Sequence, residues 1–453
     1  MDTKFFVSII APTKLDLINL NKYEIDVFQS TAQINEQKKF SIDGLLTLEE
    51  VGRLVKDGYK VTVKDESSKH ARARSEAVGF KQWMTGTERE MAEVSEESMS
   101  GGGYLTSQGI ESALLYMNNK FPLITEIISL PERTHEGRSS RAVRILKGSQ
   151  GDKNGILLIG GVHAREIVNP DLLLTFALRL CQAYSSGTSL IFGGKTYSAD
   201  IIKSIVEHLD IIIFPLVNPD GRAFVQSPTG DPMWRKNRNL NPSLQCKGVD
   251  INRNYDFLWS SGIGTSANSC SEVFKGVGAF SEPETRNVRY LIDTYSNVSC
   301  MIDVHSYSED ILYPWGDDDD QTTNTFMNFT NHSYDGQRGT LGDTLYGEYI
   351  PKSDSDWYKE TGAKMSDSIA SVRGTRYTVM EANDLYPTTG TSHDYAYSRH
   401  FVNTNERSIL GYTLETGKTF QPPYSEAVRI IKEVSAGLIE FCLASIVIVE
   451  KMN

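Results

Sequence analysis

Cysteine, long apolar runs and positive charge are all scarce in this chain. Its five cysteines among 453 residues are too few for a disulfide scaffold. No stretch approaches the ~20 apolar residues of a membrane-spanning helix, so no membrane span is expected. Lys and Arg number 46 against 58 Asp and Glu, which gives a formal net charge of −12. That balance argues against nucleic acid as a partner.

What remains is the composition of a globular protein long enough for two domains. Hydrophobic residues make up 39% and charged residues 23% of the chain, which is ordinary for a chain that buries a core. Cys181, Cys300 and Cys442 stand in apolar segments and are expected to be buried thiols. The apolar residues 437–450 predict a short helix that runs into a few core residues.

The strongest chemical signal is His163 followed three residues later by Glu166. The pair comes after the apolar residues 156–159 and two glycines, a pattern that predicts a buried strand ending in a tight turn. Imidazole and carboxylate are zinc ligands, and a catalytic zinc uses three protein ligands plus water. The third ligand should lie downstream on another strand, and His305 at the end of an apolar run is the best candidate.

A His and a Glu at this spacing are common by chance, so the interpretation depends on the motifs that follow. These are Asn218-Pro219-Asp220-Gly221, residues 234–238, residues 248–254, Phe280-Ser281-Glu282-Pro283-Glu284-Thr285, His305-Ser306-Tyr307-Ser308 and Tyr412-Thr413-Leu414-Glu415. With them the chain resembles the zinc metallocarboxypeptidases of the pancreatic carboxypeptidase A/B type. The resemblance runs from about Tyr104 to the C-terminus.

The resemblance implies a function: removal of C-terminal residues from peptides and proteins with a free C-terminus. It implies one Zn²⁺ per chain, held by His163, Glu166 and His305. Glu415 would be the general base that activates the zinc-bound water, and Arg235 would polarise the scissile carbonyl. The other implied roles are substrate binding by Arg165, Asn252, Arg253, Ser306, Tyr307, Tyr386 and His393, orientation of His163 by Asp250, and a disulfide between Cys246 and Cys270.

The chemistry of these side chains agrees with the implied roles. A free carboxylate beside a metal-activated water performs general acid–base catalysis, as expected of Glu415. A guanidinium in a dry cleft stabilises an oxyanion, which suits Arg235. The planar fork of Arg253 suits bidentate capture of a carboxylate.

The resemblance also implies an α/β fold with a mixed eight-stranded sheet flanked by helices. The zinc is expected at the carboxyl ends of central strands, and a helix is expected at residues 170–180. Residues 104–453 would form this catalytic domain.

Residues 1–66 predict a small α+β, ferredoxin-like unit with the order β-α-β-β-α-β. Its second helix begins after Thr47, a suitable N-cap. The unit resembles the family's inhibitory pro-domain, so the chain is interpreted as a zymogen, with a permanent accessory domain as the alternative. Residues 67–103 would connect the two domains. Lys69, Arg72, Arg74 and Arg89 are candidate cleavage sites for an activating protease.

Substrate preference depends on His393, which should form the floor of the pocket for the C-terminal side chain. A preference for polar or acidic termini is expected there, since a protonated imidazole could pair with a carboxylate. If the alignment is shifted, Asp394 would face the pocket and favour basic termini. Pro232 stands where a substrate-binding arginine is expected, and Arg222 is a candidate substitute. The consecutive Asp317–Asp320 run lacks the spacing of a calcium loop and predicts a solvated loop.

The sequence leaves more than one possibility open for the compartment and for the function of the protein. Residues 1–20 contain no signal peptide, so the chain would be intracellular if Met1 is the native start, whereas the family resemblance implies secretion. A monomer is expected. A zinc amidase acting on cell-wall peptides or acylated amino acids is the second enzymatic hypothesis, and an inactive peptide-binding relative is the third.

Overall fold

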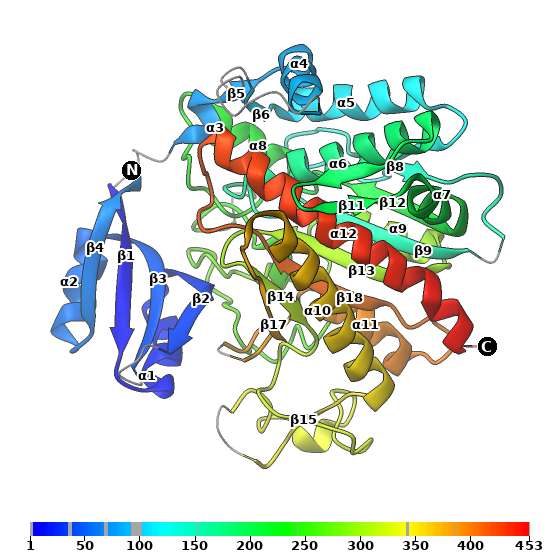
Figure 1. Ribbon diagram of the computed structural model, residues 1–453. Helices are drawn as coiled ribbons and strands as arrows, with labels where there is room; N and C mark the ends of the chain where they lie inside the picture. Colours follow the sequence, from blue (N-terminus) through cyan, green and yellow to red (C-terminus); the bar gives the residue numbers. More distant parts are fainter. Residues whose placement is uncertain are drawn as a thin grey trace.

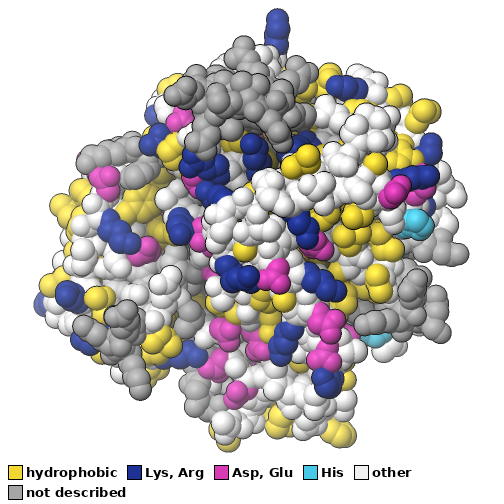
Figure 2. Space-filling view, viewed as in Figure 1, with side chains coloured by type: hydrophobic (Ala, Val, Ile, Leu, Met, Phe, Trp, Pro, Cys, Tyr) yellow, Lys and Arg dark blue, Asp and Glu magenta, His cyan; other side chains and the backbone are white. Residues whose placement is uncertain are grey.

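The computed structural model describes residues 3–34, 39–67, 71–91, 102–151, 153–241, 243–340, 344–384 and 386–452. A four-stranded and an eight-stranded sheet dominate it (Figure 1). In the described part of the chain, no helix is both long and apolar enough to cross a membrane. On the face drawn in Figure 2, acidic side chains gather toward the lower part and are interspersed with Lys and Arg.

The smaller sheet forms an N-terminal unit with a hydrophobic core of its own, which includes Val7, Ile9 and Leu46. Its order is β2-β3-β1-β4 with antiparallel neighbours, which confirms the expected small α+β unit. Thr47 and Glu50 form a capping box at the start of α2. The elements are β1 (Lys4–Ala11), α1 (Lys14–Ile18), the 3-10 turn η1 (Asn19–Tyr23), β2 (Asp26–Ile34), β3 (Phe40–Thr47), α2 (Leu48–Lys56) and β4 (Lys60–Glu66).

The larger sheet is mixed and has the order β17-β14-β18-β13-β9-β12-β8-β7. Its four central neighbours β18, β13, β9 and β12 run parallel, which confirms the expected fold. The strands are β7 (Thr125–Ser129), β8 (Arg141–Ile145), β9 (Asn154–Gly160), β12 (Leu209–Phe214), β13 (Val298–His305), β14 (Asp310–Tyr313), β17 (Thr378–Glu381) and β18 (Leu410–Glu415).

Helices cover both faces of this sheet (Figure 1). They are α5 (Ser107–Lys120), α6 (Val168–Ser186), α7 (Ala199–His208), α8 (Pro219–Gln226), α9 (Pro283–Thr294), α10 (Lys352–Arg373), α11 (Ser392–Val402) and α12 (Tyr424–Met452). Short elements complete the set: α3 (Arg72–Ser75), β5 (Ala77–Val78), α4 (Phe80–Met91), β6 (Tyr104–Leu105), β10 (Leu190–Phe192), β11 (Lys195–Tyr197), η4 (Ile251–Arg253), β15 (Gln321–Thr322), η5 (His332–Tyr334) and β16 (Glu348–Tyr349).

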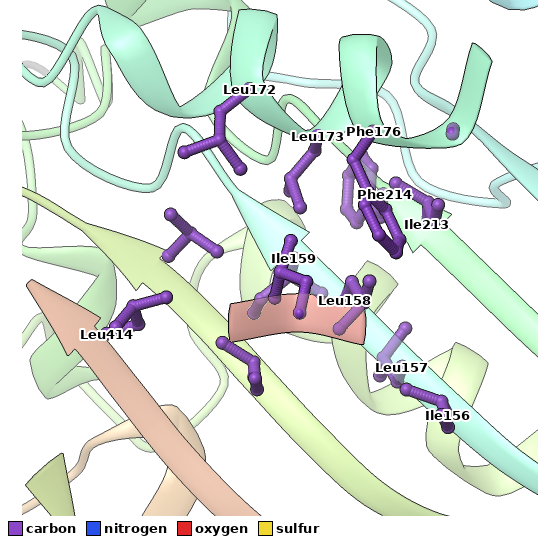
Figure 3. Packing of buried hydrophobic residues seen from close by; sticks show 14 of the residues in the cluster. Ile156, Leu157, Leu158, Ile159, Leu172, Leu173, Phe176, Ile213, Phe214 and Leu414 are labelled. Atoms are coloured by element: carbon purple, nitrogen blue, oxygen red, sulfur yellow. The ribbon is translucent and has the colours of Figure 1, made fainter. Parts of the chain in front are cut away.

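The core lies between β9 and the helices that pack on the sheet. Every residue of β9 is buried, as expected for a parallel strand covered on both faces. Leu172, Leu173 and Phe176 of α6 point toward Ile159 and the neighbouring strand (Figure 3). Each such buried side chain contributes about 1.5–3 kcal/mol, so this contact fixes α6 and the turn before it.

Two helices are longer than the sequence predicts. The C-terminal helix α12 has 29 residues and begins at Tyr424, because its apolar face extends upstream through Val428 and Val434, both buried. The helix expected at 170–180 spans Val168–Ser186 instead.

The segment between the two sheets also contributes to the large core. Ala73, Val78 and Trp83 are buried there, and β5 pairs with β6. Lys69 and residues 92–101 of the connecting segment lie outside the described residues.

Candidate active site

Three neighbouring parallel strands of the large sheet end at the same edge, and each brings one candidate residue there. His163 follows β9, His305 ends β13 and Glu415 ends β18. The register of the ladder places His305 directly opposite Glu415. The turn after β9 depends on Gly161, whose φ is +63° and where a side chain would meet Leu216 at 2.9 Å.

The expected metal ligands converge in a buried cluster. Nδ1 of His163 lies 3.0 Å from Nδ1 of His305. The Glu166 carboxylate faces both rings, with Oε1 2.7 Å from His163 Nδ1 and Oε2 3.1 Å from His305 Nδ1. Two imidazole nitrogens and a carboxylate facing one point are the donor set of a catalytic zinc site, so these residues fit the ion that the sequence predicts.

Each histidine is oriented by a buried carboxylate on its far side. Nε2 of His163 lies 3.0 Å from Asp250 Oδ1, and Nε2 of His305 lies 3.0 Å from Asp303 Oδ2. Such contacts fix the ring orientation and tautomer of a metal ligand. Asp250 was an expected residue, whereas Asp303 was missed. Its signal in the sequence is a lone aspartate inside an apolar strand.

Arg235 lies beside the first of these carboxylates. Its guanidinium donates two hydrogen bonds to Asp250 Oδ2, at 2.9 and 3.1 Å. Burial alone would raise the pKa of Asp250, but Arg235 and His163 together hold it well below its usual value. Asp250 therefore stays ionised and links the candidate carbonyl-polarising arginine to the metal cluster.

Glu415 is half-buried in the same cleft but is not one of the three ligands. Its Oε2 has no hydrogen-bond partner among the described residues. Burial raises the pKa of Glu415 to about 8, with further contributions from the charges of Glu166 and Asp310. A carboxylate that binds a proton this strongly suits a general base.

The cleft beside the cluster contains most of the expected substrate-binding residues. Its lining includes Arg165, Asn252, Arg253, Ser306, Tyr386 and His393. Asn252 Oδ1 accepts a hydrogen bond from the Ser392 backbone at 2.9 Å, which fixes the start of α11 next to the arginine. Tyr307 lies at the side, where its ring packs on Phe28 and Phe420.

Strand β2 of the N-terminal unit enters this cleft, a contact that the sequence did not reveal. Asp26 accepts two hydrogen bonds from Arg165, at 2.5 and 3.0 Å. Gln29 Oε1 accepts one from Arg253 at 2.5 Å. The ring of Phe28 lies 4.9 Å from the Arg165 guanidinium. Two arginines expected to bind substrate are therefore engaged by the chain itself.

The structure places His393, not Asp394, in the cleft lining. His393 Nδ1 is 2.9 Å from Thr413 Oγ1, and Asp394 lies fully buried, where Oδ2 accepts a hydrogen bond from Thr391 at 2.8 Å. Burial lowers the pKa of His393 to about 3, and the neighbouring His305 and Arg253 act in the same direction. The ring is therefore neutral in this state, so the charge expected to select acidic termini is absent, and a preference for polar termini stays a prediction.

Two minor expectations are also wrong. Arg222 cannot replace the missing substrate arginine, because it is buried and donates to Asp171 and to the backbone of Leu105 and Ile167. The aspartate run is not a solvated loop, since Asp317 and Asp318 are 0% and 3% exposed.

The cysteines behave as the sequence indicates. Cys246 and Cys270 form a disulfide, and Cys181, Cys300 and Cys442 are buried free thiols. The disulfide lies in the loops that follow Arg235 and Arg253, so it cross-links the segments that present both arginines.

Comparison with known proteins identifies the family. Residues 110–437 match the family model described as zinc carboxypeptidase. The chain is 32% identical over 289 residues to carboxypeptidase B of Astacus astacus, covering 63% of this chain and 77% of that protein. It is 34% identical over 221 residues to carboxypeptidase B of Helicoverpa zea, covering 48% of this chain and 47% of that protein.

The fold matches as well. The crystal structure of carboxypeptidase A from Helicoverpa armigera superposes with a TM-score of 0.72 at 19% identity, covering 99% of each chain. The chain therefore belongs to the zinc carboxypeptidase family and is a metallopeptidase, a hydrolase.

Proposed function

We propose that this protein hydrolyses the C-terminal peptide bond of peptides and proteins, using one Zn²⁺ held by His163, Glu166 and His305. The observation that supports the proposal is the position of Glu415. It ends the strand beside His305, has a buried carboxylate oxygen without a partner among the described residues, and shares one cleft with Arg253.

Each active-site residue has a separate role in the proposed reaction. Zinc at the cluster would lower the pKa of a water and polarise the carbonyl. Glu415 takes the proton of the attacking water and delivers it to the leaving amine. Arg235, held by Asp250, stabilises the negative charge that develops on the carbonyl oxygen. Asn252 and Arg253 bind the free C-terminal carboxylate of the substrate.

We also propose that residues 1–66 inhibit the enzyme until they are removed, and that residues 67–103 connect them to the catalytic domain, residues 104–453. The support is the contact of Asp26 and Gln29 with Arg165 and Arg253, because a bound substrate would need the same two arginines. Arg72 and Arg74 lie on α3 of the connecting segment and are candidate cleavage points.

The disulfide bond bears on the cellular compartment in which the protein acts. Disulfides persist in oxidising environments, so the Cys246–Cys270 bond favours an extracellular or similarly oxidising site of action. Removing the N-terminal unit by an activating protease would take place there.

The test compares matched peptides with free and amidated C-termini, using a chain that starts near Gly103, with and without a zinc chelator. Chelator-sensitive cleavage of the free form, at least 100-fold faster than the amidated form, is expected, because only a carboxylate pairs with Arg253. Equal cleavage of both peptides would contradict an exopeptidase and favour an amidase.

A further inference from the structure

A second cluster of metal-ligand side chains lies outside the cleft. His135, Glu282 and Glu284 each offer one ligand atom, and these atoms lie within 4.8 Å of one another. His135 belongs to the loop between β7 and β8, whereas Glu282 directly precedes α9 and Glu284 lies in its first turn. None of the three takes part in the proposed reaction.

The two carboxylates are buried side by side, and one of their four oxygens lacks a donor among the described residues. Glu282 and Glu284 are each 1% exposed. Nδ2 of Asn237 donates to Glu282 Oε2 at 2.7 Å and to Glu284 Oε2 at 3.0 Å. Nδ2 of Asn239 and Oγ of Ser281 also donate to Glu282, so the unpaired oxygen belongs to Glu284. Oε1 of Glu284 is buried without a partner among the described residues. A buried oxygen left unpaired is costly, which indicates that this cluster accepts a further positive group.

The histidine faces the carboxylates and is held in place by its loop. Nε2 of His135 lies 2.8 Å from Glu282 Oε2. On either side of it, Thr134 Oγ1 and the Glu136 backbone donate to Asp220 at 2.7 and 2.8 Å. The imidazole itself is 28% exposed and borders a surface pocket with Asn239 and Asn241. An ion and its waters can therefore enter from solvent.

We propose that His135, Glu282 and Glu284 bind a second divalent transition-metal ion of the Zn²⁺ class. The imidazole nitrogen favours such an ion over Ca²⁺ or Mg²⁺, which prefer all-oxygen sites. Water from the surface pocket completes the coordination. The ion joins the 131–140 loop to the start of α9, so its role is to hold these segments together.

The spacing is compatible with an ion. In a tetrahedral zinc site neighbouring ligand atoms stand about 3.4 Å apart, so the partly exposed His135 ring must withdraw by roughly half an ångström from its present 2.8 Å contact. The cleft ligands are equally close, at 2.7 to 3.1 Å.

The first experiment measures the number of zinc ions that one chain binds. The full chain is stripped with a chelator, dialysed against micromolar Zn²⁺ and analysed for zinc by mass spectrometry. We expect two zinc ions per chain, and one in His135→Gln and in Glu284→Gln. Asn241→Ala, a change in the same pocket at a residue outside the ligand set, should retain two. One ion in the wild-type chain, or two in His135→Gln, would overturn the proposal.

A second measurement needs no variant. Crystals of the wild-type chain soaked in Zn²⁺ are measured at the zinc absorption edge. An anomalous peak between His135 and Glu282 is expected, and a peak in the cleft alone would contradict the second site. This readout is independent of peptidase activity, so failure of the second site leaves the proposed function standing.

Discussion

At the scale of single residues, the carboxyl group of Glu415 should carry the proton transfers. We expect Glu415→Gln to lower kcat/KM by about 10²–10⁴-fold, the range that general acid–base catalysis contributes. The amide has the same shape but cannot accept the proton of water. Peptide hydrolysis by the activated form, with zinc content measured in parallel, checks this.

Glu381→Gln is the matched control, since Glu381 lines the same cleft from the edge strand β17. It should change kcat/KM by less than tenfold. An equal loss in both variants would show that the substitution disturbs the cleft in general and would remove the support for Glu415 as the base.

His393 should determine substrate preference through hydrogen bonding and not through charge. Its neutral ring and Thr413 present polar atoms to the cleft. His393→Leu should therefore shift the ratio of kcat/KM for C-terminal Gln over Leu toward Leu by about 10–100-fold, because a substrate amide would lose its partner. A C-terminal peptide library measures the ratio, and an unchanged ratio would place the selective contact elsewhere.

The functional residues that belong to a sequence motif could be predicted from the sequence. His163, Glu166, His305 and Glu415 were found in this way, and the structure brings them together. Asp26 was not found, because one aspartate in a strand of a separate unit has no local pattern that reveals a contact 139 residues away. The neutrality of His393 was also missed, since it depends on burial and on charged residues of two other elements, β13 and η4.

At the scale of elements, strong periodic patterns were predicted better than boundaries. The buried run of β9 was identified from the sequence, because consecutive apolar residues before a turn are typical of a strand covered on both faces. The start of α12 was missed, because charged residues on its exposed face interrupt the apolar run. Tertiary packing against α10, where Gly437 lies close to Ile369, extends the helix beyond its most apolar part.

Among the contacts of the N-terminal unit with the catalytic domain, the Asp26–Arg165 ion pair should contribute most to inhibition. Breaking a buried ion pair costs about 3–5 kcal/mol, which is more than a hundredfold in the docking equilibrium. Asp26→Ala in the full-length chain should therefore raise peptidase activity at least tenfold, because Arg165 loses its partner and β2 leaves the cleft. Initial rates on a short peptide, before any proteolysis, check this.

The control for this variant is Asp57→Ala. Asp57 also accepts a hydrogen bond within the N-terminal unit, from Tyr23 at 2.6 Å, but it is exposed and far in sequence from the strand that enters the cleft. It should leave the full-length chain as inactive as before. Activation by both substitutions would point to unfolding of the unit and not to loss of the ion pair.

At the scale of the whole molecule, the docking of the N-terminal unit on the catalytic body depends on the charge of Asp26. Burial alone would raise the pKa of Asp26, but Arg165 outweighs this effect and lowers the pKa below its usual value of 3.8. Lys4 and Arg235 also face Asp26 and act in the same direction. Arg165 stays protonated, since Asp26 raises its pKa further.

The sign of the pH dependence follows from these shifts. A carboxyl group whose pKa is lower in the docked state stabilises docking fully above its undocked pKa, near 3.8, and the stabilisation is lost only as the pH falls below that value. Inhibition should therefore be constant between pH 5 and 8. The measurement is the ratio of kcat/KM between the full-length chain and a chain starting near Gly103, because the ratio cancels the pH dependence of the shared active site. A tenfold rise in this ratio between pH 7 and 5 would mean that a group with a higher pKa controls release, and the Asp26–Arg165 pair would then not be the contact that holds the enzyme inactive.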